Sequence, residues 1–505
     1  MPTVPRVMRQ TMVAVALACA GCSSVAVAPP PPAPVIRTVA ELFEAIDREL
    51  AKPDAAIDVT RMSLWMAKIV EPDIDVEAVI REIDALAERA RPGVARAGSL
   101  NDKIKTINAA LFDEAGLATG MAHHRWISQL LRTHQGQCVS MSMLYAAVAQ
   151  RLGLDARLVP LPEHLMVRLV DGSHRINIEA TAKGATLSDA DYEARFGCTA
   201  GPWYLHELTK RELVAVLLSR HLAYDLAGMG RRGDALACAA RALTLCAIDP
   251  GVYGNYGVEL RAAGRTQEAI EAYDAALKLD STTALEAAKT WNNRANAVAD
   301  CGRIDEALEN YDRALRCDPR YAGAMANKAG LLLRLGRVEE ALKLCEAALE
   351  IDPRDRDALV NMATGLGSSG RDGEALPFYD RALAIDPKNA VIWSNRSNTL
   401  SHLDRYEEAL AGYEQALKIA PAFVGALANR GVTLYKLGRP MQAIASFDAA
   451  IAAEPRDSRA WISKSAALYE TGQPAEALRC VEKAAEHGVR IPADLVEKIR
   501  RAAQK

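Results

Sequence analysis

The sequence predicts a mostly α-helical protein in two parts, a small α+β domain followed by a long superhelix of helix pairs. Half of the 505 residues are hydrophobic but only 5% are aromatic, and this Ala- and Leu-rich composition favours helices packed through small residues. The second half of the chain repeats with a period of about 34 residues. Between the two helical regions, three short runs within 156–180 have the composition of strands.

The first 36 residues predict an export signal and a tether. Arg6 and Arg9 precede an apolar run at 12–18 that is too short to span a bilayer. The following Cys-Ala-Gly-Cys-Ser-Ser resembles the processing box of bacterial lipoproteins, which implies a signal peptide at 1–21 and a lipid on Cys22. An ordinary signal peptide, cleaved nearby without a lipid, is the alternative. The Pro-rich segment 22–36 favours a semi-rigid spacer.

These features predict that the mature protein lies in the cell envelope, lipid-anchored to a membrane and facing the periplasm. Ser23 follows Cys22 where an Asp would be the alternative, which resembles the outer-membrane sorting pattern of diderm bacteria. The choice between inner and outer membrane stays open. With 61 basic and 64 acidic side chains, the chain lacks the basic excess of a nucleic-acid binder. We therefore expect no nucleic-acid partner.

Residues 37–213 are predicted to form one domain that begins with helices. Apolar residues at helical spacing predict helices such as Val39–Leu50 and 75–90, and 37–130 as a whole is expected to be helical. A further helix is expected from Cys138 to Leu152. The three strand-like runs that follow are 156–161, 165–170 and 174–180, with a turn at 171–173.

Three residues of this domain are expected to converge. Cys138 begins a helix, where unpaired backbone N–H groups and the helix dipole favour thiolate over thiol. His164 begins one strand and Glu179 ends the next across a hairpin, so the imidazole and the carboxylate are expected side by side. A thiol nucleophile needs an adjacent base, and the base needs a third group that fixes its tautomer. Cys, His and acid supply that set, although a lone Cys in an apolar helix is more often a core residue.

In the second half of the chain, several residue types recur at a constant interval of 34 residues. The recurring residues include Pro319, Pro353, Pro387, Pro421 and Pro455, and Ala307, Ala341, Ala375, Ala409, Ala443 and Ala477. A helix pair with small crossing residues and a closing Pro is the tetratricopeptide pattern. We predict about eight repeats over 214–491 and a capping helix at 492–505. The step from Gly264 to Gly302 is longer by four than the step from Gly302 to Gly336, so the extra residues, placed within 281–290, are expected to lengthen a helix.

An asparagine recurs at one position of the first helix in six repeats. The set is Asn255, Asn293, Asn327, Asn361, Asn395 and Asn429. Side-chain amides donate and accept hydrogen bonds, so such an asparagine ladder is able to pair with the backbone of an extended peptide whatever its sequence. It predicts a protein or extended-peptide partner in the groove of the array. The alternative is that these asparagines serve packing between repeats.

The domain resembles the transglutaminase-like cysteine hydrolases, a superfamily with a papain-like core, and in particular its bacterial members that carry tetratricopeptide repeats. The matching motifs are Gly136-Gln137-Cys138, Pro162-Glu163-His164 and 176–181, within a resemblance that covers about 40–200. The resemblance implies that Cys138 is the nucleophile, His164 the general base and Glu179 the orienting acid. It further implies that Gln137, or the nearby Gln135, contributes to an oxyanion hole. Val139 stands where an aromatic residue is common, and Glu179 where Asp is usual.

No metal or cofactor is expected from the sequence. His123, His124 and His134 match no common zinc spacing, and no Cys pair accompanies them. His174 lies at a turn and is interpreted as a surface residue. The cysteines of the repeats fall mainly at core positions, and whether any of them form disulfides stays open.

Two functions remain open from the sequence. The first is a membrane-anchored, exported cysteine hydrolase of amide or peptide bonds whose repeats bind a protein or peptide partner. Hydrolysis is favoured over acyl transfer, because water is the abundant acceptor. The second is a non-catalytic envelope lipoprotein whose repeats act as a protein-interaction scaffold.

Overall fold

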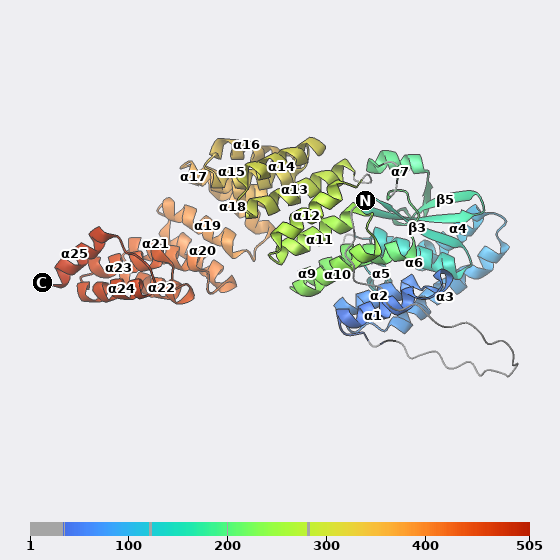
Figure 1. The fold of residues 1–505 in the computed structure, drawn as a ribbon, viewed down its shortest axis with the longest axis horizontal. Coiled ribbons are helices and arrows are strands. Elements are labelled where there is room, and N and C mark those ends of the chain that lie inside the picture. Colours follow the sequence, from blue (N-terminus) through green and yellow to red (C-terminus); the bar gives the residue numbers. More distant parts are fainter. Residues whose placement is uncertain are drawn as a thin grey trace, which may run out of the picture.

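The computed structural model describes residue 34 and residues 36–504, except 121–123, 199, 202 and 280–282. An α+β domain lies at one end, and an array of helix pairs leads away from it to the C-terminus (Figure 1). The predicted fold class, mostly helical with a small N-terminal α+β region and a tetratricopeptide-like array, is confirmed. The predicted signal peptide, Cys22 and nearly all of the predicted tether lie outside the described residues.

The described part of the domain begins with five α-helices, and capping side chains stabilise the starts of the first four. They are α1 (Val39–Leu50), α2 (Val59–Val70), α3 (Val76–Arg96), α4 (Leu100–Asn108) and α5 (Ile127–Thr133). Thr38, Asp58, Asp75 and Ser99 each accept a hydrogen bond from a backbone N–H in the first turn of the helix that follows. Such a cap stabilises a helix by about 1 kcal/mol. The apolar faces of these helices are buried in the domain core.

Helix α6 packs against an antiparallel sheet. The elements are α6 (Cys138–Arg151), β3 (Asp155–Leu161), β4 (His164–Asp171), β5 (His174–Glu179) and β6 (Ala185–Leu187), and α7 (Asp189–Phe196) follows the sheet. The strand order is β3-β4-β5-β6. Val167 pairs with Ile178, which brings the start of β4 and the end of β5 to the same end of the sheet.

Two strand pairings were not foreseen from the sequence. The short strand β1 (Ala118–Thr119) pairs in parallel with β2 (Gln135–Gly136), within and just after the region expected to be helical. Strand β6 adds an edge to the predicted hairpins. Each of these strands is too short for an alternating pattern to be recognised.

The first repeat helices share a hydrophobic core with the domain. Helices α8 (Lys210–Val216) and α9 (Ala223–Gly228) are joined by a π-helical stretch at 217–222, and α10 (Arg232–Leu245) follows. One cluster of buried residues runs from Ile36 to Val252 and includes Trp126 and Trp203. The domain and the start of the array are therefore held together by hydrophobic burial.

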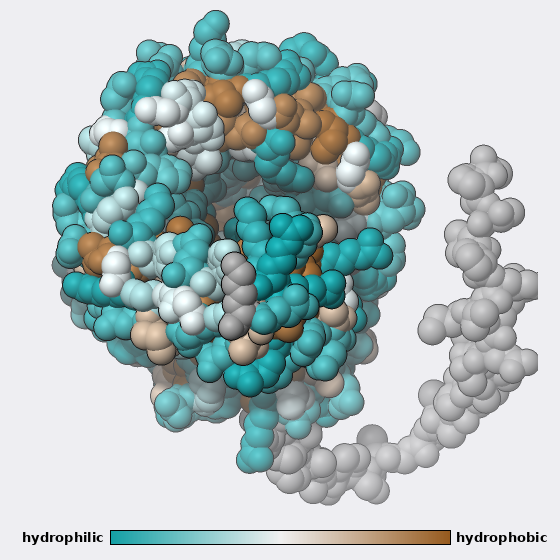
Figure 2. Space-filling view, turned by 90° about the vertical axis from the view of Figure 1, so that its left-hand side faces the viewer, coloured by the Kyte–Doolittle hydropathy of each residue, from teal (hydrophilic) through white to brown (hydrophobic). Residues whose placement is uncertain are grey.

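The remaining helices form the rest of the array. They are α11 (Pro250–Ala262), α12 (Thr266–Leu277), α13 (Ala284–Asp300), α14 (Ile304–Cys317), α15 (Ala322–Arg334), α16 (Val338–Ile351), α17 (Arg356–Ser368), α18 (Asp372–Ile385), α19 (Ala390–His402), α20 (Tyr406–Ile419), α21 (Val424–Lys436), α22 (Pro440–Ala453), α23 (Ser458–Glu470), α24 (Pro474–Glu486) and α25 (Ala493–Ala503). The recurring alanines are fully buried, because only a small side chain fits where paired helices cross closely. Viewed towards the C-terminal end, the surface is hollowed at its centre (Figure 2).

Helix α13 differs from its counterparts in the other repeats. It has 17 residues, whereas α15 and α17 have 13. The expectation that the longer step between Gly264 and Gly302 lengthens a helix is confirmed. Among the described residues, no helix is both long enough and apolar enough to cross a membrane.

Asp404 occupies the turn position where most repeats have a glycine. Gly370 and Gly438 have φ values of 72° and 76°, and Asp404 has a φ of 59°. This left-handed conformation is open to Gly and tolerated by Asp and Asn, but it is strained for a β-branched residue.

We therefore expect Asp404→Val to lower the free energy of unfolding by about 1–2 kcal/mol. Asp404→Asn, which removes the charge but tolerates the same backbone, is expected to stay within about 0.5 kcal/mol of wild type. Urea unfolding followed by circular dichroism measures both. Equal losses in the two variants would contradict a backbone cause.

Candidate active site

The sequence Gly136-Gln137-Cys138 forms the start of α6. Cys138 is the first residue of the helix and is half-buried. The Gln137 backbone N–H donates to Ser140 Oγ at 3.1 Å, and the Ser140 hydroxyl donates to the His124 carbonyl at 2.8 Å. A Cβ atom on Gly136 would approach side-chain atoms of Leu130 and Ser140 to 2.8 Å. Close packing therefore explains the glycine and fixes the position of the thiol.

His164 and Glu179 are joined by a hydrogen bond. His164 Nε2 lies 2.8 Å from Glu179 Oε2, and the Glu179 side chain is only 1% exposed. The carboxylate also accepts from the Thr181 backbone N–H at 3.1 Å, from the Thr181 hydroxyl and from the Tyr192 hydroxyl at 3.3 Å. The imidazole stacks on Phe196, with ring centroids 5.0 Å apart. Because Nε2 is engaged by the acid, Nδ1 is the nitrogen left to take a proton from the thiol.

The charges of the site favour a protonated His164. Burial acts to lower the pKa of its imidazole, but hydrogen bonding and charge interactions with Cys138 and Glu179 outweigh burial and raise the pKa to about 9. Burial likewise acts to raise the pKa of the Glu179 carboxyl, but the bonds from His164 and Thr181 bring it below its usual value. A charged carboxylate beside an imidazolium therefore exists at neutral pH.

The structure places Cys138 at the start of α6, and His164 and Glu179 at adjoining ends of β4 and β5, and their catalytic roles stay predictions. Cys138 and His164 line one cleft of about 460 Å³, and Cys138 is among the groups that raise the pKa of His164. Between these two described residues, no bond satisfies strict hydrogen-bond geometry. Catalytic contacts without a substrate are often long, and they tighten only in the complex. Gln137 lines the same cleft, whereas the alternative Gln135 is exposed on β2.

The cleft, which we call the thiol cleft, is closed on one side by the array. Its lining from the repeat helices includes Asn255, Glu286, Lys289 and Asn293. Lys289 forms an ion pair with Glu163, the residue before His164. Sequence reasoning missed Glu286 and Lys289 as members of the site. The signal was present, however, because both lie in the segment where the repeat step is longer than elsewhere in the array.

A buried charge cluster lies behind the thiol cleft. Arg220 Nη2 is 2.8 Å from Asp249 Oδ1 and 3.9 Å from Glu286 Oε1, and Asp249 is fully buried. The neighbouring His221 is a second histidine of the cleft wall. Burial, together with the charges of Arg125 and Arg220, lowers the pKa of His221 to about 3. His221 is therefore neutral at pH 7, unlike His164.

The asparagine ladder is used in part between neighbouring repeats. Asn327 donates to Asn292 Oδ1 at 2.9 Å, and Asn361 donates to the Ala326 carbonyl at 2.9 Å. The side-chain amide of Asn255 donates a comparable hydrogen bond to Ser219, and that of Asn429 donates one to Asn398. The packing alternative thus accounts for one donor of these side chains. All six asparagines remain partly exposed, so a role in binding stays a prediction.

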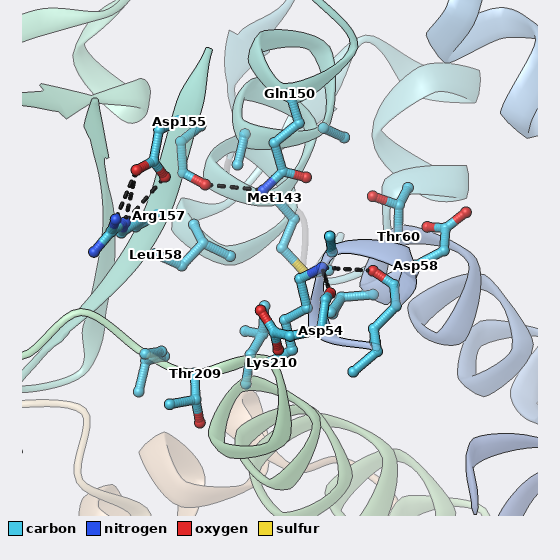
Figure 3. A pocket seen from close by; sticks show the side chains of 18 of the residues that line it. Asp54, Asp58, Thr60, Met143, Gln150, Asp155, Arg157, Leu158, Thr209 and Lys210 are labelled. Atoms are coloured by element: carbon cyan, nitrogen blue, oxygen red, sulfur yellow. Dashed lines mark hydrogen bonds and ion pairs between the residues drawn. The ribbon is translucent and has the colours of Figure 1, made fainter. Parts of the chain in front are cut away.

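A cavity larger than the thiol cleft lies elsewhere in the domain. It measures about 1,100 Å³ and is lined by the start of α2, one face of α6, β3 and α8 (Figure 3). Its polar groups bond within the protein: Lys210 Nζ donates to the Ile57 carbonyl at 2.9 Å, and Gln150 Nε2 donates to the Ala156 carbonyl at 2.8 Å. It contains none of the predicted catalytic residues, so it is not the candidate active site.

The histidines considered as metal ligands do not form a cluster in the described part of the chain. His124 Nδ1 lies 3.1 Å from the Gln135 carbonyl, and His134 ends α5 with a φ of 57°. His123 lies outside the described residues. No group of three or more Cys, His, Asp or Glu residues that could hold a metal is present among those described.

Comparison with protein families assigns both parts of the chain. A model of the transglutaminase-like superfamily matches residues 77–219. Tetratricopeptide repeat models match 256–322, 292–356, 378–411, 398–438 and 428–490. The chain joins a transglutaminase-like domain to a tetratricopeptide repeat array. No curated protein matches the chain significantly.

Solved structures similar to the chain are tetratricopeptide repeat proteins. One from Parabacteroides merdae is 17% identical, with a TM-score of 0.39, over 51% of this chain and 99% of its own. YrrB, described as having an unusual peptide-binding site, is 24% identical, with a TM-score of 0.32, over 38% of this chain and 96% of its own. TTC0263 from Thermus thermophilus is 23% identical, with a TM-score of 0.32, over 37% of this chain and 99% of its own.

The raised pKa of His164 predicts a pH-dependent contribution to stability. A group whose pKa is raised from 6.5 to about 9 by folding contributes stability that is complete below pH 6.5 and is lost as the pH rises through about 9. The loss of stability in His164→Gln is therefore expected to be about 2–3 kcal/mol larger at pH 6 than at pH 10. Urea unfolding at the two pH values measures it.

The exposed His174 provides the control. His174→Gln measures the effect of removing an exposed imidazole at the same two pH values. A pH-independent loss in His164→Gln would show that the imidazole is not held in its charged form.

Proposed function

We propose that the chain is a cysteine hydrolase of amide or peptide bonds. Cys138 is the nucleophile, His164 the general base and Glu179 the acid that orients it. The observation that carries this proposal is the 2.8 Å bond from Glu179 to His164 beside a half-buried thiol at the start of a helix. That arrangement contains each group that thiol catalysis requires.

The geometry supports a two-step reaction. In the charged form of His164 that the raised pKa favours, the Cys138 proton already lies on Nδ1, and the thiolate sulfur attacks the substrate carbonyl carbon. His164 then gives the proton to the departing amine, which leaves a thioester on Cys138. Water attacks the thioester as the neutral His164 takes its proton; the carboxylic acid is released, and the thiolate of Cys138 is restored beside the charged imidazole.

The oxyanion of each tetrahedral intermediate needs hydrogen-bond donors. The first N–H groups of α6 have no partner within the helix, and the Cys138 N–H is among them. The Gln137 side chain, which lines the thiol cleft, is proposed as a second donor. Because the cleft opens to solvent, we propose that water, and not a second amine, accepts the acyl group from Cys138.

We propose that the repeat array binds the protein or peptide substrate. The array supplies one wall of the thiol cleft, so a partner held by the repeats lies close to Cys138. The alternative function, a scaffold without catalysis, shares the partner but not the thiol chemistry.

The thiol chemistry is tested by alkylation with iodoacetamide at pH 7, followed peptide by peptide with mass spectrometry. The exposed Cys301 of the same chain is the internal reference. An ordinary thiol is only about 3% ionised at pH 7, so an activated Cys138 is expected to react about 10-fold faster than Cys301.

His164→Ala is expected to remove this advantage, and Glu179→Gln to reduce it, while the rate at Cys301 stays constant. If Cys138 reacts no faster than Cys301 in the wild type, the scaffold function is the one that remains.

Export and lipid anchoring are proposed from residues 1–36, with Cys22 as the lipidated residue. Expression in a diderm bacterium with radiolabelled palmitate is expected to label the wild type and place it in the membrane fraction. Cys22→Ser is expected to abolish the label. Export of an unlabelled wild type would instead indicate an ordinary signal peptide.

A further inference from the structure

We propose that the thiol cleft is a channel for a polypeptide in extended conformation, and that Asn255 and Asn293 position the backbone of that polypeptide across Cys138. This inference rests on the proposed thiol chemistry and specifies the conformation and path of the substrate. The first repeats are then part of the active site, and the asparagine ladder begins inside it.

The thiol cleft has one wall from each part of the chain. Cys138 and His164 come from α6 and β4, and Asn255 and Asn293 come from α11 and α13. The shared hydrophobic core beneath, which runs to Val252 on α11, holds the two walls in place. A substrate that reaches the thiol therefore touches the repeats as well as the domain.

The irregularity of the array lies at this cleft. Helix α13 is four residues longer than α15, which is about one additional turn. It carries Glu286, Lys289 and Asn293, all of which line the thiol cleft. The ion pair of Lys289 with Glu163 closes one side of the cleft beside His164. The departure from the repeat thus builds the wall that faces the catalytic histidine.

Helix α11 presents glycines to the cleft. Gly251 and Gly254 both line it, and a Cβ atom on Gly254 would meet nothing within 4 Å. Glycine inside a helix is less favourable than alanine, so packing within the protein does not explain Gly254. A bare helix surface allows a peptide backbone to approach closely.

Asn255 and Asn293 have complementary hydrogen-bonding capacity left. The Asn255 amide nitrogen donates to Ser219 Oγ at 3.2 Å, and Asn293 Oδ1 accepts from Asn292 at 3.3 Å. In the described part of the chain, Asn255 Oδ1 and the Asn293 amide nitrogen have no hydrogen-bond partner. One acceptor and one donor are therefore available, as an extended backbone requires.

The spacing of the two asparagines suits an extended chain. Packed helices lie about 8–10 Å apart, and an extended chain rises about 3.3 Å per residue. Successive first helices of the array therefore correspond to about three residues of substrate. Asn327 and Asn361, the next members of the ladder, line a second cavity of about 490 Å³ on α15 and α17, so the path continues along the array.

Unpartnered polar atoms in the cleft wall also indicate a ligand. Trp203 Nε1 and His221 Nδ1 are buried, and neither has a hydrogen-bond partner among the described residues. Both residues line the thiol cleft. Native proteins leave few buried polar groups unpaired, so two at one cleft point to a polar occupant such as a peptide.

The test compares three alkylating probes of Cys138. They are iodoacetamide, an iodoacetyl-capped decapeptide of Ala, Ser and Thr, and the same decapeptide with N-methylated backbone amides. The wild type is expected to react at least 10-fold faster with the plain decapeptide than with its N-methylated analogue. N-methylation removes backbone donors but keeps the side chains.

Gly254→Leu places a side chain in the cleft, at a position where a Cβ atom meets nothing within 4 Å, and replaces a weak helix former by a strong one. It is expected to lower the rate with the plain decapeptide about 10-fold more than it lowers the rate with iodoacetamide. Asn293→Ala is expected to lower the decapeptide rate several-fold. The matched control is Gly373→Leu on α18, where a Cβ atom also meets nothing within 4 Å; it is expected to leave all three rates unchanged.

The outcomes separate this inference from the proposed function. If iodoacetamide shows no His164-dependent advantage at Cys138, the thiol chemistry itself is wrong. If that advantage is present but Gly254→Leu leaves the decapeptide rate unchanged, the channel is wrong. Equal wild-type rates with the plain and N-methylated peptides would overturn recognition of the backbone.

Discussion

The hydrogen bond between His164 and Glu179 is the interaction on which the candidate site depends. A carboxylate that is 1% exposed is costly to bury unless it is paired. Here the imidazole, the Thr181 backbone and hydroxyl, and the Tyr192 hydroxyl together surround it. The same set holds the histidine ring in position at the thiol cleft and leaves its second nitrogen without a carboxylate partner. Stability and chemistry are therefore served by one network.

The junction of the two parts is the second constraint. A continuous hydrophobic core joins the domain to the first repeats, and the Arg220–Asp249 pair is buried beside it. Because the array is fixed to the domain, its first helices serve as a wall of the thiol cleft. The repeats then act as a part of the site in addition to any binding along their length.

The regular positions of the repeats and the departures from regularity at α11 and α13 have different structural explanations. Fully buried alanines such as Ala307 and Ala341 keep the helix pairs closely packed, so the residues at the regular positions are explained by folding. The longer helix α13 and Gly254 of α11 are not explained by that packing, and both lie at the cleft. The asparagines combine the two roles, since their amides bond between repeats while remaining partly exposed.

The sequence by itself determined the helical array, the hairpins of the domain, and the positions of Cys138, His164 and Glu179 at a helix start and two strand ends. Those features are local, because a repeat period, a helix start and a tight turn are each contained in a short stretch of chain. The contribution of Lys289, Trp203 and His221 to the cleft was decided by the tertiary structure alone. These residues are distant from Cys138 in sequence, and only the packing of the array against the domain brings them to it.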